Sequence, residues 1–488
     1  MDRDVKRIND TAIALFGTVT KMEEEAVRKS SDAELSVTEV HTLAAIGTGR
    51  PRTMTHVANI LGIKVSTLTT AVGRLVRKGY VGRSSDEKDR RIVKLSLTEK
   101  GRSAVREHEA FHEAVAGDAI AQIPQENLSA FISSLEKISS FMTMRSSMPY
   151  EKGTEFELRP LKLAGHTLPV PIVSAGMSIG VAGKRLASAV AVQGGLGLIG
   201  TSCIGYRSEG YDKDPLGSDL RVLEAETAEA CRMVKEAGGS GLIGAAVMWN
   251  DRDAGEYVRA AVRGGAQVIV TSAGLPKDLP KYCTDRKVAL LPTISSRRAA
   301  AAITRTWTQK YNRTPDGFIY QGPAAAGLLG FRESELERAC SDNFKIIAEI
   351  KAELAKLENC PLIVGGGIFD KSDAENVFRY GADGILMGTR FIATEECDAG
   401  EEYKRLYLNC TENDVTIVRS PMKTSARVMK NTFADMLAGT GKEDYDIIRA
   451  VLRGIEGDRD GGLIFCSANA GRISRTDTVG DVFREFTT

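Results

Sequence analysis

Eight short apolar runs in the second part of the chain constrain its fold more than any other feature. Stretches with helical periodicity, among them 184–193, 222–236, 297–310 and 374–380, separate these runs. Alternation of strands with helices predicts a parallel sheet, and eight such units fit a (β/α)8 TIM barrel of the α/β class. A doubly wound parallel sheet is the alternative. The eight runs are 171–177, 196–200, 242–248, 267–274, 289–295, 317–322, 361–368 and 384–390.

Glycines follow the seventh and eighth runs. Gly365, Gly366 and Gly367 end the seventh run, and Gly388 and Thr389 end the eighth. Barrels often bind phosphate in these two loops, because glycine lets backbone N–H groups approach an anion closely. These glycines fit a phosphate site or simple strand ends equally well.

A second glycine pattern fits the dinucleotide-binding spacing G-x-G-x-x-G but stands in the wrong context. The pattern runs from Gly195 to Gly200. It follows a helical stretch and leads into a strand, whereas the fingerprint follows a strand and opens a helix. We therefore do not expect a Rossmann-type site here.

The first part of the chain predicts a winged helix-turn-helix of the α+β class. A short helix over 53–61 ends at Gly62, and Ser66 is expected to cap a second helix that ends at Gly79. Alternating apolar residues over 81–97 predict a hairpin that forms the wing. The second helix of such a motif enters the major groove, and a wing can reach phosphates or the minor groove. The expected DNA contacts are Ser66, Thr67, Thr69, Thr70 and Arg74 on the helix, with Arg90 and Arg91 on the wing.

Charge supports this interpretation. The chain has a net charge of +1, yet residues 51–100 hold 11 Lys or Arg against 4 Asp or Glu. A basic segment in a neutral protein suits nucleic acid, although a solvated surface is the simpler explanation.

Cysteine usage and hydropathy favour a cytoplasmic protein. All eight cysteines follow residue 200 and none forms a C-x-x-C pair, which predicts free thiols. The charged start lacks the apolar core of a signal peptide, and no apolar run is long enough to cross a membrane.

Histidines are confined to the first 166 residues. His108 and His112 match the H-E-x-x-H metalloprotease pattern. No third ligand is evident, so we expect no metal there. A polar lining beside an effector pocket and an ordinary helix surface are the alternatives.

The stretches HTLAAIG, TMTHVANIL, LVRKGYV, DEKDRRIVKLSLTEKG and HEAFH resemble MarR-type regulators, in particular repressors of bacterial fatty-acid synthesis genes. The resemblance covers residues 1–146. It implies a homodimer, built from the first helix and two later helices over about 99–118 and 125–143. It also implies binding to a palindromic DNA operator. A linker is expected over 147–157.

The stretches PIVSAGMSIGVAG, QGGLGLIG, QGPAAAGLLGF, PLIVGGGI and GADGILMGTRFIATEECDA resemble the nitronate monooxygenase family, which includes FMN-dependent enoyl-ACP reductases. The resemblance covers 158–488, with 397–488 as a lid and substrate region. It implies an FMN barrel. The cofactor-binding residues implied are Ala175, Gly176, Met177, Ser272, Gln321, Gly365, Gly366, Gly367, Gly388 and Thr389, and Ala273 and Gly274 end the fourth strand at the same mouth.

The chain departs from the family at the position that usually supplies a histidine. Leu328 occupies that position, Gln321 replaces an acid and Ala326 a glycine, and Ala246 stands where many relatives have asparagine. Leucine cannot exchange protons, and acid–base help is worth roughly 10²–10⁴ in rate. The catalytic residue is therefore unknown. Alternative proton donors are Asp398, Cys397 and Lys423, and an anionic ligand could meet Ser420, Lys423 and Arg427 or find only a solvated surface.

Two functions fit these features. One is a transcription regulator fused to an FMN-dependent oxidoreductase of the nitronate monooxygenase or enoyl reductase type, with NAD(P)H as a possible electron donor. The other is a catalytically degenerate barrel that senses redox state or an acyl-type ligand for the repressor. Analogy alone links either function to fatty-acid metabolism.

Overall fold

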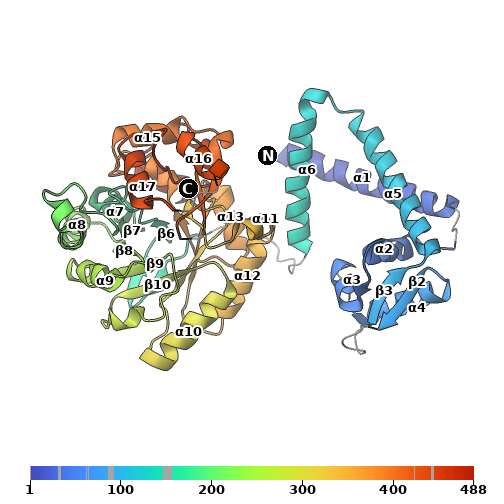
Figure 1. Ribbon diagram of the computed structural model, residues 1–488, viewed down its shortest axis with the longest axis horizontal. Helices are drawn as coiled ribbons and strands as arrows, with labels where there is room; N and C mark the ends of the chain where they lie inside the picture. Colours follow the sequence, from blue (N-terminus) through green and yellow to red (C-terminus); the bar gives the residue numbers. More distant parts are fainter. Residues whose placement is uncertain are drawn as a thin grey trace. The chain divides into compact units, whose positions relative to one another are not determined.

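The computed structural model describes residues 2–30, 34–61, 63, 65–85, 93–146, 157–422, 424–440 and 444–487. The chain forms two compact units, residues 1–139 and 140–488, and each is considered by itself (Figure 1). Within the described residues, no helix combines the length and the apolar character needed to cross a membrane.

The N-terminal unit is a winged helix-turn-helix framed by long helices. Leu43, Leu68, Val72, Leu75 and Leu95 form its fully buried centre, so α2, α4 and the wing share one core. Ser36 caps α2, with Glu39 completing a capping box. Its elements are α1 (Asp2–Lys29), α2 (Val37–Ile46), β1 (Arg52–Thr53), α3 (Met54–Leu61), α4 (Val65–Arg77), β2 (Val81–Ser85), β3 (Val93–Leu97), α5 (Glu99–Ile120) and α6 (Gln125–Ser146).

The helix-turn-helix and the wing are confirmed, with one correction. Helix α4 already begins at Val65, so Ser66 lies inside its first turn and is not the cap that we expected. Strands β2 and β3 pair antiparallel as the wing, and β1 adds a third strand. Gly62 and the wing tip with Arg90 and Arg91 lie outside the described residues.

The second unit is a closed barrel of eight parallel strands, which confirms the predicted TIM barrel and excludes the doubly wound sheet. Helices surround the strands in Figure 1. The strands are β6 (Ile172–Ser174), β7 (Leu196–Gly200), β8 (Leu242–Met248), β9 (Val268–Ser272), β10 (Ala289–Ile294), β11 (Phe318–Gln321), β13 (Leu362–Gly365) and β14 (Gly384–Met387). The main outer helices are α7 (Lys184–Val192), α8 (Pro215–Glu236), α9 (Ala254–Arg263), α10 (Arg297–Tyr311), α11 (Glu333–Ser341), α12 (Asn343–Leu354) and α13 (Lys371–Arg379).

Apolar side chains fill the barrel in the way its sequence predicts. Val173, Leu198, Val270, Leu291 and Ile363 come from five different strands and belong to one buried interior cluster. The strands' other faces pack against the surrounding helices in a larger cluster. Both faces of each strand are therefore apolar, as is usual for a parallel sheet.

Smaller elements add to the barrel. The hairpin of β4 (Leu161–Leu163) and β5 (His166–Leu168) buries Leu163 and Leu168 in the interior cluster. A second sheet joins β12 (Gly327–Leu328), β16 (Ser425–Met429) and β15 (Val415–Arg419). The remaining helices are α14 (Thr389–Ile392), α15 (Glu401–Leu408), α16 (Thr432–Thr440), α17 (Ile447–Ile455) and α18 (Val479–Thr487).

Candidate functional site

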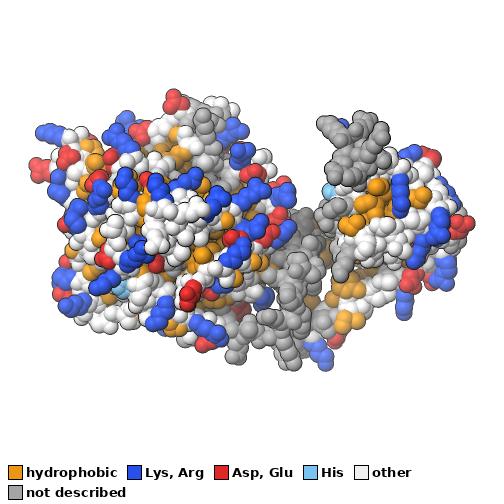
Figure 2. All heavy atoms as spheres, turned by 90° about the horizontal axis from the view of Figure 1, so that it is seen from below, with side chains coloured by type: hydrophobic (Ala, Val, Ile, Leu, Met, Phe, Trp, Pro, Cys, Tyr) orange, Lys and Arg blue, Asp and Glu red, His pale blue; other side chains and the backbone are white. Residues whose placement is uncertain are grey.

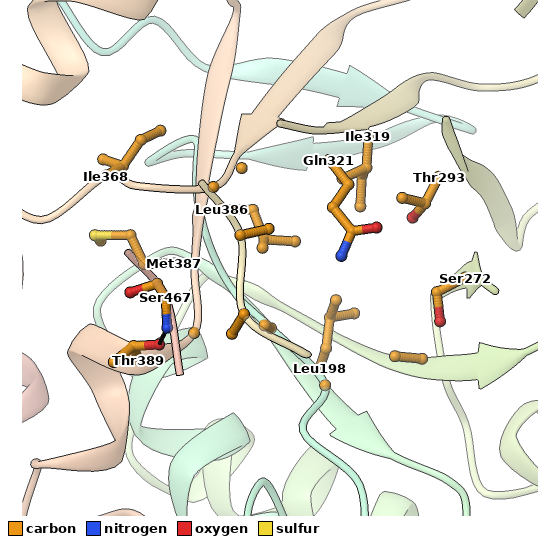
Figure 3. Close-up of a pocket in the computed structure, with 18 of the residues that line it drawn as sticks. Leu198, Ser272, Thr293, Ile319, Gln321, Ile368, Leu386, Met387, Thr389 and Ser467 are labelled. Carbon is orange, nitrogen blue, oxygen red and sulfur yellow. Dashed lines mark hydrogen bonds between the residues drawn. The ribbon is translucent and has the colours of Figure 1, made fainter. Parts of the chain in front are cut away.

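A cavity of about 210 Å³ lies at the carboxyl ends of the barrel strands. Of the ten residues implied as cofactor-binding, the cavity is lined by all except Met177 (Figure 3). Met177 lies close by, because a Cβ at Gly388 would stand 3.9 Å from its Sδ. Residues more than 200 positions apart in the sequence thus meet at one mouth, as ligand sites of TIM barrels do.

The glycine loops form a backbone cradle. Gly366 and Gly367 have φ values of +107° and +80°, which favour glycine. A Cβ at Gly366 would come within 3.0 Å of the Gly322 carbonyl oxygen, and one at Gly367 within 2.8 Å of Ala324 Cβ. Among the described residues, no hydrogen-bond acceptor is found for the backbone N–H groups of Gly366, Gly367, Gly388 or Thr389. Such N–H groups suit an anion.

The C-terminal segment closes this cradle from the side. The Thr389 hydroxyl accepts a hydrogen bond from the Ser467 N–H at 3.1 Å, drawn as a dashed line in Figure 3. The Asn469 side-chain amide donates to the Gly367 carbonyl at 2.9 Å. Sequence reasoning missed Ser467, because no spacing relates it to the glycines almost a hundred residues earlier.

Arg390 places a buried cation beside the same cradle. It is 6% exposed, and it lines the cavity. Its two terminal nitrogens pair with Asp477 at 2.7 Å and with Glu485 at 3.1 Å. Its Nε is buried and finds no partner among the described residues. A buried donor without an acceptor is costly, so this Nε is free to take an acceptor from a bound molecule.

The part of the cavity across from the glycine loops is polar, but among the described residues it has no side chain that would act as an acid or base near neutral pH. Ser272, Thr293 and Gln321 line it (Figure 3), and the Gln321 side-chain amide donates to the Leu328 carbonyl at 3.1 Å. The titratable side chains in the described lining are Tyr320 and Arg390. The Tyr320 hydroxyl donates to Asn343, and burial raises the pKa of Tyr320.

Leu328 does not line this cavity. It lies in β12, and its side chain packs against the apolar cluster formed by the C-terminal segment. Ala246 does line the cavity and lies against Gly176, where an added Cβ would clash with the Ala246 Cβ. At the family's histidine position this chain thus has an apolar side chain that packs on the same cluster as Met177.

The alternative proton donors lie elsewhere. Asp398 accepts backbone N–H groups of Gly183, Arg185 and Leu186 at the start of α7. Burial raises the pKa of Asp398, although these three hydrogen bonds lower it. Cys397 is fully buried, and its thiol donates to the Val181 carbonyl. Neither residue lines the cavity, and Lys423 lies outside the described residues.

Ser420 and Arg427, suggested as contacts for an anion, are both buried and do not form a solvated surface. Ser420 is fully buried and hydrogen-bonds Thr424 at 2.9 Å. Arg427 is buried and donates to the carbonyls of Pro323 and Ala325 at 2.6 and 2.7 Å. Arg427 therefore positions the loop after β11, on which Ala325 and Ala326 line the cavity.

Helix α4 presents the predicted DNA-contacting residues on its outer face. Leu68, Val72 and Leu75 point into the core. The exposed residues on the other side are Ser66, Thr67, Thr69, Thr70 and Arg74. The helix therefore separates a packing face from an exposed polar face, and its last turn carries two exposed arginines, Arg74 and Arg77.

Comparisons with known proteins fit both units. Residues 159–488 match the nitronate monooxygenase family, and residues 34–92 match the MarR family. One curated relative, from Mycobacterium tuberculosis, is (3aS,4S,5R,7aS)-5-hydroxy-7a-methyl-1-oxo-octahydro-1H-indene-4-carboxyl-CoA dehydrogenase. It is 24% identical over 267 residues, which cover 55% of this chain and 65% of the relative. The chain thus spans just under two thirds of that relative's length.

Solved structures resemble each unit separately. A mutant of FabK from Thermotoga maritima matches with a TM-score of 0.50 and 21% identity, over 65% of this chain and 90% of FabK. FabT of Streptococcus pneumoniae, solved in complex with DNA, is 34% identical over 28% of this chain and 97% of FabT, with a TM-score of 0.28.

Proposed function

The chain belongs to the nitronate monooxygenase family, and we propose that it is a DNA-binding regulator whose C-terminal unit is an FMN-binding barrel. The family consists of FMN-dependent flavoenzymes. The observation that carries the FMN proposal is the cradle of free backbone N–H groups beside the unpartnered Nε of Arg390. We propose 1–146 as the regulator domain, 147–157 as the linker and 158–488 as the barrel.

These residues fit a flavin mononucleotide. The N–H groups at Gly366, Gly367, Gly388 and Thr389 would hold its phosphate, because glycine leaves the backbone open to an anion. The side chains of Ala175, Met177 and Leu198 and the backbone of Gly176 would lie against its ring. Ser272 and Gln321 would offer polar contacts. Bound FMN would supply hydride or electron transfer.

The described lining of the cavity would orient a substrate and exclude water, but it has no side chain with a pKa near 7 to act as acid or base. Leu328 has no group that exchanges protons, and Asp398 binds N–H groups at the start of α7. Transfer of a hydride needs no proton from the protein in the same step, whereas a substrate that must be protonated would need water or its own acid. This favours flavin reduction by NAD(P)H or an activated substrate over chemistry that relies on the family's histidine.

We propose an acyl thioester as the ligand class of the barrel. The support is the relative from Mycobacterium tuberculosis, whose name describes a dehydrogenase of a carboxyl-CoA compound. A link to fatty-acid metabolism rests on the same reasoning and on the resemblance of the N-terminal unit to regulators of fatty-acid synthesis genes.

We propose that the N-terminal unit binds a palindromic operator as a homodimer. Its polar α4 face can contact base edges and phosphates, since small hydroxyl side chains allow close approach. The apolar residues that α1 exposes support a dimer, as they have no partner surface among the described residues that would bury them: Ile8, Ile13, Leu15 and Phe16 are each more than half exposed.

A second candidate function is a sensor. In this case the barrel binds flavin or acyl ligand without turnover and changes the operator affinity of the regulator. The lack of an ordinary acid or base in the described cavity lining favours it. Coupling requires that the ligand binds the DNA-competent and incompetent states with different affinity.

One experiment separates the two candidates. The flavin-loaded protein is mixed without air with NADH or NADPH, then in separate samples with a nitronate or an enoyl thioester. Bleaching of the flavin followed by product formation identifies an enzyme. Flavin that none of these reagents reduces, together with operator binding that changes on adding an acyl thioester, identifies a sensor.

A further inference from the structure

A cluster of one carboxylate and three imidazoles joins three helices of the N-terminal unit. Glu23 lies on α1, His41 on α2, and His108 and His112 on α5. Glu23 Oε1 stands 2.6 Å from His41 Nε2, 2.8 Å from His108 Nε2 and 3.5 Å from His112 Nε2. The His108 and His112 Nε2 atoms are 3.2 Å apart. Ligand atoms of Glu23, His41 and His108 therefore lie within 4.8 Å of one another, and His112 adds a nitrogen close to Glu23 and His108.

The surroundings of the H-E-x-x-H pattern on α5 differ from those expected in a metalloprotease. His108 and His112 are one helical turn apart and face the same way, while Glu109 between them is exposed and does not join the cluster. The further ligands come from α1 and α2, which no sequence spacing indicates. The structure thus places further candidate ligands beside His108 where the sequence shows none.

Hydrogen bonding alone accounts poorly for this arrangement. Three imidazoles direct the same kind of nitrogen at a single carboxylate oxygen, and His108 and His112 bring two ring nitrogens within 3.2 Å of each other. Two neutral imidazoles satisfy such a contact only if one nitrogen donates and the other accepts.

We propose that Glu23, His41, His108 and His112 form a site for a divalent transition metal, with Zn²⁺ as the ion that fits best. Zinc binds imidazole nitrogen and carboxylate oxygen at about 2.0–2.2 Å in a tetrahedral arrangement. Bonds of that length separate the ligand atoms by roughly 3.3 Å. The distances from Glu23 Oε1 to the three imidazole nitrogens, 2.6–3.5 Å, lie close to that value, so side-chain rotation would complete the arrangement.

The ligand set selects the metal class. Three nitrogen ligands and one oxygen suit Zn²⁺, Co²⁺ or Ni²⁺, whereas Mg²⁺ and Ca²⁺ prefer oxygen ligands alone. His41 and His112 have side chains 47% exposed, while Glu23 and His108 side chains are 9% exposed. The ion would enter from the solvent side past His41 and His112 and be anchored on the buried pair.

The site would hold the helix-turn-helix against the long helices that frame it. Helix α2 packs against α3 and α4, so a metal shared by α1, α2 and α5 restrains the position of the helix-turn-helix. A consequence for DNA rests on the proposed function: metal binding would change operator affinity. The metal site itself stands on its ligands alone.

Metal binding by the full-length, tag-free protein tests the proposal. After dialysis against a chelator, the protein is titrated with Zn²⁺ in competition with a chromophoric chelator. We expect one tight Zn²⁺ per chain and at least a ~100-fold loss of affinity in His112→Ala, because lost ligands cost more than the 10–100-fold of outer-shell partners. His112 is half exposed, so its replacement leaves the fold intact, which circular dichroism checks. Glu23→Gln, of nearly the same shape, is the second variant.

His166→Ala is the matched control, since His166 lies in the barrel and hydrogen-bonds the Lys287 carbonyl. Its zinc affinity should equal that of the unchanged protein. Co²⁺ should give the visible bands of a four-coordinate site without thiolate charge transfer, which excludes the exposed Cys340 as the ligand. No tight zinc in the unchanged protein, or equal affinity in His112→Ala and Glu23→Gln, would overturn the site.

Operator binding is measured separately on the same proteins by fluorescence anisotropy, with DNA from upstream of the protein's own gene. A zinc-dependent change in affinity that His112→Ala abolishes extends the site to regulation. Tight zinc with unchanged DNA binding overturns only the regulatory consequence. Tight zinc with no DNA binding at all contradicts the proposed function and leaves the site in place.

Discussion

Backbone groups at four residues dominate the chemistry of the barrel cavity. Gly366, Gly367, Gly388 and Thr389 line the cavity with N–H groups that have no acceptor among the described residues, and Arg390 adds a buried guanidinium whose Nε also has no partner there. None of these interactions depends on a side chain that exchanges protons. The residue scale therefore supports anion binding more strongly than catalysis.

Bulky replacements in the cradle should release the cofactor. Gly366→Val must adopt φ near +107° and meets the Gly322 backbone, so it should displace the loop as well as block the anion. Gly388→Val has no positive φ and mainly fills the cradle. We expect bound FMN to fall at least ~10-fold in both, measured as flavin absorbance per protein after gel filtration.

Gly400→Ala is the control for these two variants. Gly400 lies at the start of α15, away from the cavity, and a Cβ there meets nothing within 4 Å. It should keep the flavin content of the unchanged protein. Unaltered flavin in Gly388→Val would show that the phosphate is held elsewhere.

The sequence predicts the glycines of this cavity but not their partners. Strand ends and family resemblance lead directly to Gly365 and Gly388, because positions just after barrel strands share one face. Ser467 and Arg390 stay hidden, since their roles depend on how the C-terminal segment folds back. Leu328 is visible as a departure from the family, yet only the structure shows which apolar cluster its side chain packs against.

At the scale of elements, the exposed face of α4 is the part proposed to contact DNA, whereas the start of α7 is stabilised by a carboxylate. Helix α4 hides three apolar residues and presents hydroxyls with Arg74. Helix α7 has its first N–H groups bound by Asp398, which comes from the loop after the eighth strand.

Replacing Arg74 of α4 with alanine should weaken DNA binding. Arg74→Ala loses a phosphate or base contact worth about 1–3 kcal/mol, so operator affinity should fall roughly 5- to 150-fold. Anisotropy titrations at several salt concentrations measure this, and a phosphate contact would also lower the salt slope by about one. Arg106→Ala, an exposed arginine of α5 paired with Glu99, is the control. An equal loss of operator affinity in Arg74→Ala and Arg106→Ala would argue against α4 as the helix that contacts the DNA bases.

Replacing Asp398 should destabilise the barrel without changing the flavin. Asp398→Ala removes the acceptor of three N–H groups, and those of the buried residues Gly183 and Leu186 each cost about 1–3 kcal/mol when unpaired and dry. Urea unfolding should show a loss of about 2–4 kcal/mol once water reaches some of these groups. Asp398→Asn keeps one acceptor oxygen and should lose less. A variant of normal stability with altered flavin reduction would instead identify Asp398 as a proton donor.

Element prediction succeeds where periodicity is strong. All eight barrel strands appear at the predicted runs, because buried parallel strands are continuous apolar segments. The hairpin of β4 and β5 and the sheet of β12, β15 and β16 escape prediction. Their strands are two to five residues long, and partners such as Leu328 and Ala426 are almost a hundred residues apart. The predicted cap at Ser66 is wrong, because a residue type that favours capping does not by itself fix where a helix begins.

At the scale of the whole molecule, α1 exposes apolar residues that a monomer leaves in water. Ile8, Ile13 and Phe16 are 68%, 64% and 66% exposed. The visible face of the N-terminal unit in Figure 2 also shows hydrophobic side chains close together, whereas charges of both signs are interspersed over the barrel unit. Exposed apolar patches of this kind mark association surfaces.

A charge on this helix should separate the proposed dimer. Phe16→Asp puts a carboxylate where the account expects a buried contact, so light scattering should shift from dimer to monomer at micromolar concentration. Operator affinity should fall with it, because two half-sites are then bound independently. Leu275→Asp, 45% exposed on the barrel, is the control and should leave the mass unchanged. A dimer that survives Phe16→Asp would contradict the interface.

The most direct test of the account is the visible spectrum of the purified, full-length protein, followed by identification of any flavin released on denaturation. We predict a yellow protein with about one FMN per chain, lost in Gly388→Val and retained in Gly400→Ala. A colourless protein that takes up no FMN on reconstitution would contradict the central claim, and would leave the cradle at Gly366 and Arg390 as a site for another anion.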